Sequence, residues 1–539
     1  MDRLTAVADQ VLKSFSDETN TRKSLEGRRA LTPFLLEELR KLPSFSGRAN
    51  ECVLTSEEEV EKHSYDHSHH LPARPEVVVY PESTETVSEV MKFCYTNKIP
   101  VTPCGARTGL EGGCIPIAGG VALNLSRMNR VLQVFHDELQ VHVQAGIRKN
   151  AFNDLLSKEK LLFQVDPASN PSLGGMAATG SSGTLCCKYG TMKENVVSLV
   201  VVMPDGAIVD TRRRTRKSST GYDLTNLMMG QEGTLAVVCE LIVKVIPVPK
   251  GECSALLVFR DLDPCSRLVV LMRQQQLNLS RCELLGKQTV ETLLKFEERK
   301  REKEKKRATG RQKKEGAKKQ HFSLPSPAKP TLLIQVHAAS PQAAEAEINQ
   351  AVNLARQEGV EEVKVATEPH LQEALWDLRR AAYFACLSNR QHMIERKAKD
   401  VRMLNTDVCV PLPAFPELIG ATERDFAEVA QKGGPFFVCN IFGHAADGNF
   451  HCIVLFDHGN SEEVRSLEAL ERRMWARCLA AGGTVSGEHG VGLGKVGALT
   501  AEHGEAKLRV MRQLKGAVDE RGIMNPGKVL PSLKTSGDK

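Results

Sequence analysis

Three tracts of small residues constrain the fold of this 539-residue chain more than any other feature of its sequence. They cover residues 103–113, 166–190 and 229–237, and the middle tract is far too long for a single turn. Backbone without large side chains can approach a ligand closely. Three such tracts suit an extended ligand, such as a dinucleotide, laid across the backbone of one domain. Three independent tight turns are the alternative.

Strand-like and helix-like patterns alternate around the first tract. Residues 76–80 predict a strand and residues 84–98 a helix, and a further strand leads into the glycines. A strand-like run rather than a helix follows them, so the dinucleotide fingerprint of a Rossmann unit does not fit. The tract also lacks the lysine of a Walker loop. Its backbone amides and the Thr108 hydroxyl could still hold a phosphate.

The composition is that of an ordinary globular protein. With 41% hydrophobic and 26% charged residues, a chain of this length can bury a sizeable core and divide into two or three domains. No apolar run approaches the roughly 18–20 residues that a membrane-spanning helix needs, so we expect no transmembrane span. Fifteen cysteines without a CxxC pair indicate a reducing compartment. The N-terminus is amphipathic but contains acidic residues, which leaves it ambiguous as a targeting segment.

One segment departs from this composition. Residues 297–319 hold twelve Lys or Arg against five Glu, a local charge of +7. The segment has few apolar side chains to bury, so we expect a solvated, disordered insertion over about residues 297–330. Binding to a nucleic acid or another anionic surface is the alternative. No aromatic residue lies between the charges, so we do not expect nucleic acid as a partner.

The stretch GHAADGNFH places His444 and His451 seven positions apart, separated by small and turn-forming residues. A turn there can bring the two imidazoles back towards one point, and the stretch SGEHGVG supplies Glu488 as a third ligand. Two histidines and one carboxylate form a set that suits a divalent cation with open positions. Two histidines satisfied by hydrogen bonds in a turn would explain the same residues.

Seven segments, taken in order, resemble the FAD-linked D-lactate dehydrogenases and glycolate oxidase subunits of the vanillyl-alcohol-oxidase flavoprotein superfamily. The resemblance runs from about residue 36 to residue 530 and leaves out only the N-terminal extension and the basic insertion. The segments are PCGARTGLEGG, NPSLGGMAATGSSGT, GQEGTLAVV, TDVCVP, GHAADGNFH, SGEHGVG and MNPGKVL.

The resemblance implies an α+β fold. We expect a two-subdomain α/β FAD-binding domain of the p-cresol methylhydroxylase type, an antiparallel-sheet cap domain, and a C-terminal segment that returns to the flavin. The expected boundaries are 1–35 for the extension, 36–250 for the FAD-binding domain, 251–495 for the cap, which includes the insertion, and 496–539 for the C-terminal segment.

The resemblance also assigns the FAD-binding residues. The loop at 103–109 would hold the diphosphate, the tract at 174–190 would line the flavin and ADP moieties, and residues 232–237 with Asn525 would complete the site. The first loop has no histidine, so we expect FAD to be bound non-covalently. The individual residues are Pro103, Gly105, Ala106, Arg107, Thr108, Gly109, Pro167, Gly174, Thr179, Ser182, Gly183, Tyr189, Gly190, Glu232, Gly233, Val237 and Asn525.

One position departs from the family pattern. Relatives usually have glycine where this chain has Arg107, so a bulky side chain occupies a backbone position that would suit a positive φ or a close approach to the diphosphate. The arginine could compensate by pairing with the phosphates.

In relatives, the positions of His444, His451 and Glu488 bind zinc or manganese beside the flavin. A metal on the substrate hydroxyl lowers its pKa while hydride leaves C2 for flavin N5. A base must then take the hydroxyl proton, and His489 is the candidate. Support of the metal ligands is the alternative role for His489.

A substrate carboxylate calls for arginine, whose fork can bind it through two hydrogen bonds. Arg379 and Arg380 lie on a predicted helix, where adjacent positions point about 100° apart, so only one of them is expected to face the flavin. The family resemblance favours Arg379 and leaves Arg380 as a surface charge.

The resemblance implies FAD-dependent oxidation of a D-2-hydroxy acid to the 2-oxo acid. D-Lactate is the expected substrate, with glycolate and D-2-hydroxyglutarate as alternatives. The chain has no NAD fingerprint, so electrons would pass to a cytochrome such as cytochrome c, to a quinone or to an electron-transfer flavoprotein. Eukaryotic relatives are commonly mitochondrial, which makes that location the expectation and the cytoplasm the alternative.

Two functions of other classes compete with this one. A metal-dependent hydrolase would use the two histidines and Glu488, but it would give the small-residue tracts no function. A binding protein would rest on the basic insertion and would bind polyanions in a salt-sensitive way.

Overall fold

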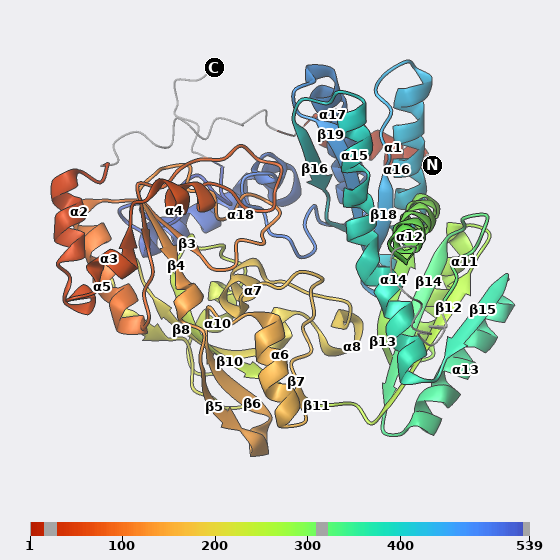
Figure 1. Ribbon diagram of the computed structural model, residues 1–539, viewed down its shortest axis with the longest axis horizontal. Coiled ribbons are helices and arrows are strands. Elements are labelled where there is room, and N and C mark those ends of the chain that lie inside the picture. The colour runs from red at the N-terminus through yellow and green to blue at the C-terminus, as the bar shows by residue number, and fades with distance from the viewer. Residues whose placement is uncertain (1, 14, 16–29, 309–321, 532–539) are drawn as a thin grey trace. The chain divides into compact units, whose positions relative to one another are not determined.

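The computed structural model describes residues 2–13, 15, 30–308 and 322–531 and divides into two compact units (Figure 1). The first unit consists of Lys13–Gly183, Tyr189–Val248 and Glu488–Lys539. The second consists of Met1–Leu12, Thr184–Lys188 and Pro249–Gly487. After Val248 the chain runs through the second unit as far as Gly487, and it returns to the first unit at Glu488.

The first unit contains a four-stranded sheet in the order β1-β2-β4-β3. Strand β2 pairs in parallel with β4, which pairs in parallel with β3, while β1 runs antiparallel to β2. Every residue of β2 and β4 is buried, as expected for parallel strands covered on both faces. The strands are β1 (Val53–Leu54), β2 (Val77–Val79), β3 (Val101–Cys104) and β4 (Val121–Asn124).

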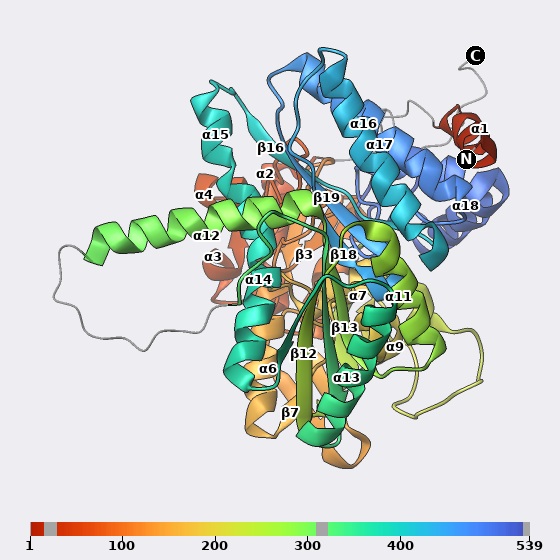
Figure 2. The ribbon, with the colours of Figure 1, turned by 90° about the vertical axis from the view of Figure 1, so that its right-hand side faces the viewer.

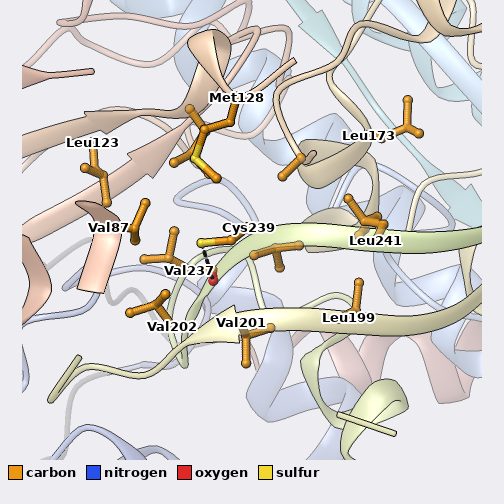
Figure 3. Close-up of a cluster of buried hydrophobic side chains, with 14 of the residues drawn as sticks. Val87, Leu123, Met128, Leu173, Leu199, Val201, Val202, Val237, Cys239 and Leu241 are labelled. Atoms are coloured by element: carbon orange, nitrogen blue, oxygen red, sulfur yellow. Dashed lines mark hydrogen bonds between the residues drawn. The ribbon is translucent and has the colours of Figure 1, made fainter. Parts of the chain in front are cut away.

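A second, antiparallel sheet of the first unit has the order β5-β6-β10-β8-β9. One hydrophobic core joins the two sheets: Val87 and Leu123 come from the side of the parallel sheet, and Leu199 and Leu241 from the antiparallel one (Figure 3). The strands are β5 (Val131–Phe135), β6 (Gln140–Gln144), β8 (Val196–Val202), β9 (Ile208–Asp210) and β10 (Val237–Lys244), with a separate pair of β7 (Leu161–Leu162) and β11 (Ile246–Pro247).

The helices of the first unit begin and end at recognisable signals. Helix α5 starts where the Ser83 hydroxyl accepts from the Thr86 amide and ends at Lys98, which is left-handed. Helix α7 starts at the Ser172 cap and ends at the left-handed Gly180. The helices are α2 (Pro33–Arg40), α3 (Ala49–Cys52), α4 (Glu57–Lys62), α5 (Thr84–Asn97), α6 (Lys149–Lys158), α7 (Leu173–Thr179), α9 (Met192–Asn195), α10 (Leu224–Met228) and α18 (Leu499–Val518).

The second unit is built on one antiparallel sheet in the order β15-β12-β14-β13-β18-β19-β16, with β17 also paired to β19. The strands are β12 (Gly251–Val258), β13 (Leu279–Leu285), β14 (Thr331–Ala338), β15 (Glu362–Ala366), β16 (Val401–Asn405), β17 (Val408–Cys409), β18 (Asn440–His444) and β19 (Asn449–Asp457).

Helices α13 and α14 flank strand β12 of this sheet (Figure 2). Leu375 and Ala382 of α14 pack against Leu256 and Leu333 of the sheet. In the described part of the chain, no helix is both apolar enough and long enough to cross a membrane. The helices are α1 (Asp2–Leu12), α11 (Leu262–Gln274), α12 (Lys287–Ala308), α13 (Pro341–Gln357), α14 (Pro369–Ser388), α15 (Arg390–Glu395), α16 (Phe415–Gln431) and α17 (Ser461–Ala480), while α8 (Cys186–Tyr189) crosses the boundary between the units.

The basic insertion differs from our expectation over its first part. Helix α12 continues to Ala308, so residues 297–308 are helical rather than irregular (Figure 2). Buried Val290 and Leu293 anchor the start of the helix, and the Glu, Lys and Arg residues that follow are good helix formers. Residues 309–321 lie outside the described chain, and residues 322–330 form no regular element.

The insertion contains exposed residues that we expect to be replaceable and a buried residue, Leu324, that we expect to contribute to stability. We expect that replacing residues 299–321 by a Gly-Ser chain of equal length leaves the free energy of unfolding nearly unchanged, because residues 299–303 are exposed. Leu324, by contrast, is buried in the core beneath α14, so Leu324→Ala should cost about 2–5 kcal/mol. Denaturant unfolding of both variants measures the difference. A large loss of stability in the replacement variant would show that the segment is structural.

Candidate active site

The turn between β18 and β19 brings His444 and His451 together. His444 ends β18, a short 3-10 turn follows, and β19 begins at Asn449, which lies opposite His444. Gly448 in the turn has a φ of 73°, and a Cβ there would lie 2.0 Å from the carbonyl oxygen of Val410. The two imidazole rings are buried, with centroids 5.7 Å apart.

Glu283 lies between His444 and Arg379. Its Oε1 is 2.6 Å from Nδ1 of His444, and its Oε2 accepts a hydrogen bond of 2.7 Å from Nε of Arg379. The side chain is fully buried on β13. Burial alone would raise the pKa of Glu283, but the nearby His444 and Arg379 and the hydrogen bonds that they donate lower this pKa below its ordinary value. Glu283 is therefore a buried carboxylate, which sequence reasoning did not select.

Asp407 is a second buried carboxylate that the sequence analysis missed. Its Oδ1 accepts from the Asn449 side chain at 2.8 Å, and its Oδ2 accepts from the Ser486 hydroxyl at 3.0 Å. Asp407 and His451 each offer a ligand atom within 4.8 Å of the other's. Asp407 is fully buried, and a buried aspartate must be paired or must bind a ligand. In the sequence, the position of this aspartate beside the apolar run of TDVCVP was the signal that could have identified it.

The histidines fit a metal because one nitrogen of each ring is already engaged. Nδ1 of His451 lies 3.1 Å from the carbonyl oxygen of Thr406, and Nδ1 of His444 faces the Glu283 carboxylate. Both oxygens can only accept, so each Nδ1 carries a proton, and in the neutral form of each ring Nε2 holds the lone pair that could bind a cation. Acceptors of this kind typically orient metal-ligating histidines.

The two adjacent arginines of α14 point to different surroundings. Arg379 is buried, and its guanidinium lies 4.7 Å from the centroid of the Phe442 ring. The Arg380 side chain is 48% exposed and pairs with Glu373 and Asp377 of its own helix. Of the two adjacent arginines, Arg379 is therefore the one that points into the interior, and whether it faces a flavin stays a prediction.

In the first unit, the loop after β3 contains a residue with positive φ and a glycine that lies very close to a neighbouring segment. Arg107 has a φ of 53°, so the glycine-like conformation expected at this position is confirmed. Its Nη1 is buried and has no hydrogen-bond partner among the described residues. A Cβ on Gly105 would lie 2.3 Å from the Ser172 hydroxyl oxygen. Pro103 lies within β3, and Ala106, Thr108 and Gly109 are further residues of the loop.

The second tract is held tightly in the same unit. A Cβ on Gly174 would lie 2.6 Å from that of Ala145, and one on Gly183 would lie 2.5 Å from the backbone of Asp166. The crowding explains the small residues without reference to a ligand. The remaining candidates of this tract are Pro167, Thr179, Ser182, Tyr189 and Gly190.

The third tract and the C-terminal segment meet the first tract. Glu232 has a φ of 54°, and its buried carboxylate accepts from the amides of Val491 and Gly492 at 2.7 and 2.8 Å. Burial raises the pKa of Glu232, although the two amides oppose the rise. Asn525 donates to the carbonyl oxygens of Gly113 and Glu232 at 2.9 and 2.7 Å.

Two further candidates of this tract play different local parts. Gly233 has a φ of 74°, a conformation that favours glycine. The side chain of Val237 is fully buried in the hydrophobic core (Figure 3), so only its backbone could contact a cofactor.

The boundary between the two units falls at the Gly487–Glu488 peptide bond, so Glu488 and His489 belong to the first unit. Gly487, the last residue of the second unit, donates its amide to the carbonyl oxygen of Asp407 at 3.0 Å. Glu488 follows directly, and its Oε2 accepts from the Ser182 hydroxyl at 2.5 Å. Nε2 of His489 lies 3.8 Å from Oε1 of Glu488.

Both parts of the chain match known families. Residues 75–212 match the family described as FAD binding domain, and residues 248–529 match the family described as FAD linked oxidases, C-terminal domain. The chain belongs to the FAD-linked oxidases. The resemblance found in the sequence is thereby confirmed.

The relatives agree with this assignment. A probable mitochondrial D-lactate dehydrogenase of Danio rerio is 34% identical over 482 residues, which cover 89% of each chain. The mitochondrial D-lactate dehydrogenase (cytochrome) of Arabidopsis thaliana is 34% identical over 85% of this chain and 74% of its own. A glycolate oxidase subunit of Bacillus subtilis is 28% identical over 87% of this chain and 91% of its own.

Solved structures confirm the predicted α+β fold. p-Cresol methylhydroxylase with substrate bound superposes with a TM-score of 0.68 at 15% identity, covering 92% of this chain and 96% of the other. 4-Ethylphenol oxidase from Gulosibacter chungangensis gives a TM-score of 0.69 at 15% identity, covering 94% and 99%.

Arg107 allows a test of the first loop. Replacing an arginine at positive φ by glycine relieves strain of about 1 kcal/mol, so Arg107→Gly should stabilise the FAD-free protein. If the guanidinium pairs with the diphosphate, the same variant should bind FAD more weakly. Thermal unfolding of the FAD-free protein and FAD titration measure the two effects.

Lys98→Gly is the matched control for this variant. Lys98 has a φ of 56° at the end of α5, and we assign it no part in the cofactor site. The control should gain stability with unchanged FAD affinity. FAD affinity that is equally unchanged in Arg107→Gly would remove Arg107 from the cofactor site.

Proposed function

We propose that this FAD-linked oxidase is a D-lactate dehydrogenase that oxidises a D-2-hydroxy acid to the 2-oxo acid. The observation that carries the proposal is the buried group in which one carboxylate, Glu283, holds both Arg379 and His444. The arginine could bind the carboxylate of a 2-hydroxy acid, and the histidine could help to hold a metal at its hydroxyl. The names of the zebrafish and plant relatives support D-lactate as the substrate.

The first unit would hold FAD non-covalently. The loop with Gly105 and Arg107 would take the diphosphate, since the buried Nη1 of Arg107 offers a donor there. The tract from Gly174 to Gly190 and the Glu232–Asn525 contact would line the rest of the cofactor. FAD, when bound, supplies the hydride acceptor at flavin N5.

Arg379 would bind the substrate carboxylate. Its Nε is engaged by Glu283, which leaves the two terminal nitrogens of the fork to face a ligand. Burial strengthens such a pair because water competes less for both charges. The fixed guanidinium would orient C2 and its hydroxyl.

His444, His451 and Glu488 would hold a divalent cation, zinc or manganese, which would lower the pKa of the substrate hydroxyl. Because Nδ1 of each histidine is engaged by an oxygen, each histidine would bind the cation through Nε2. Asp407, whose carboxylate lies 3.7 Å from Nδ1 of His451, would help to orient that ring. His489 would then accept the hydroxyl proton, with Glu488 adjacent to it.

Two other substrates fit the same groups. Glycolate has the carboxylate and the hydroxyl but no methyl group, and the names of the Bacillus subtilis and Escherichia coli relatives favour it as the second candidate. D-2-Hydroxyglutarate adds a second carboxylate. A metal-dependent hydrolase is a weaker proposal, because it would leave the FAD-binding part of the chain idle.

We further propose a cytochrome as the electron acceptor and the mitochondrion as the location. The names of the Arabidopsis thaliana and Saccharomyces cerevisiae relatives support both. A quinone or an electron-transfer flavoprotein is the alternative acceptor, and the cytoplasm is the alternative location.

The anaerobic flavin spectrum tests the proposed reaction. D-Lactate should bleach the flavin absorbance stoichiometrically, and L-lactate should not. Glycolate and D-2-hydroxyglutarate, tested in parallel, rank the substrates by the rate of bleaching. A yellow protein that none of the D-2-hydroxy acids or glycolate reduces would contradict the proposal.

Arg379→Lys tests the carboxylate site. Lysine replaces a fork by a point charge and cannot make the same pair of hydrogen bonds. The loss of about 1–3 kcal/mol of transition-state stabilisation should lower kcat/KM for D-lactate roughly 5- to 150-fold, while FAD stays bound. Arg380→Lys, one residue away on the exposed face of α14, is the control and should behave as wild type. Equal kinetics in the two variants would remove Arg379 from the site.

A further inference from the structure

We propose that Glu283 is a positioning residue that sets the tautomer of His444 and the orientation of Arg379 at the same time. The inference rests on the proposed function, because it assumes that His444 binds a metal and that Arg379 binds the substrate carboxylate. It adds a residue that neither the sequence nor the family comparison selected.

The sheet register places Glu283 where it can serve both partners. Glu283 on β13 lies directly opposite His444 on β18, and such cross-strand pairs have Cβ atoms about 4.5–5.5 Å apart. Helix α14 supplies Arg379 to the same face of the sheet, since Arg379 also lies over the ring of Phe442 on β18. The two oxygens of one carboxylate are thus divided between a strand and a helix.

The contact with His444 decides which ring nitrogen can bind a metal. A carboxylate oxygen only accepts, so Nδ1 of His444 must carry the proton at the distance of 2.6 Å. In the neutral ring the lone pair then resides on Nε2. The neutral form with a proton on Nε2 cannot ligate through that atom.

The contact with Arg379 determines how the amide of a glutamine at position 283 would orient, so Glu283→Gln should have a defined effect on His444. Arg379 Nε can only donate, so it will take the amide oxygen of the glutamine. The amide nitrogen must then face Nδ1 of His444 and donate to it, which moves the histidine proton to Nε2. The reversed amide would instead set two donors, Nε of Arg379 and the amide nitrogen, against each other.

Glu252→Gln is the matched control. Glu252 lies in the same sheet, on β12, and its Oε1 is 3.5 Å from Nε2 of the buried His337. The control therefore replaces a carboxylate beside a buried histidine by the same amide. We assign neither Glu252 nor His337 a part in the reaction.

The first test measures metal and flavin in the full-length protein. Glu283→Gln should lower the affinity for Zn²⁺ or Mn²⁺, measured by competition with a chelator, by about 10–100-fold. It should also raise KM for D-lactate, while FAD content and the Glu252→Gln variant stay at the wild-type level. Wild-type metal affinity in Glu283→Gln would overturn the inference and leave the proposed function standing.

The second test does not depend on the metal. In metal-free protein with ¹⁵N-labelled histidine, the ¹⁵N shifts of His444 should show the proton on Nδ1 in the wild type and on Nε2 in Glu283→Gln. A wild-type spectrum with the proton on Nε2 would overturn the inference. A wild-type protein that binds no metal would contradict the proposed function, and the histidine spectra would still decide the role of Glu283.

Discussion

The buried carboxylate of Glu283 is the interaction on which the candidate site depends. A charge without solvent is tolerated only when it is paired and hydrogen-bonded, and Glu283 meets this condition with Arg379 on one oxygen and His444 on the other. Removing one member of a buried ion pair typically costs about 3–5 kcal/mol, because the remaining charge is left uncompensated. Strand β13, strand β18 and helix α14 are therefore fixed to one another by the group that also fixes the site.

The first unit is constrained in a different way, because there is very little space beside its backbone at several glycines. Gly105, Gly174 and Gly183 each lie so close to a neighbouring segment that a Cβ would collide with it. These contacts keep the loops compact in the region that would hold the cofactor. Arg107 adopts a strained backbone conformation in the same region.

The sequence predicted what local patterns and the family resemblance encode. The helix at Thr84–Asn97 and the turn that joins His444 to His451 follow from short stretches of sequence. The positive φ of Arg107 was suggested by the relatives, which usually have glycine there. The second half of α12 was mispredicted, since charge alone does not distinguish a solvated helix from a solvated loop.

Glu283 could not be found in the same way. Residues 281–284 read Arg-Cys-Glu-Leu, an alternation of polar and apolar residues that is typical of a strand with one face in water. The polar face is instead covered by α14, whose place on the sheet depends on contacts between residues almost a hundred positions apart. Such a long-range contact leaves no trace in the strand itself.

The central claim is that His444 and His451 hold a metal that assists oxidation by a flavin bound elsewhere in the chain. Metal analysis and flavin absorbance on the same preparations of the wild type and of His451→Ala test it most directly. The account predicts one metal per flavin in the wild type, and a His451→Ala protein that stays yellow but loses the metal and most of its activity. A wild-type protein that oxidises D-lactate with no stoichiometric metal would contradict the account and leave both histidines as structural residues of the turn.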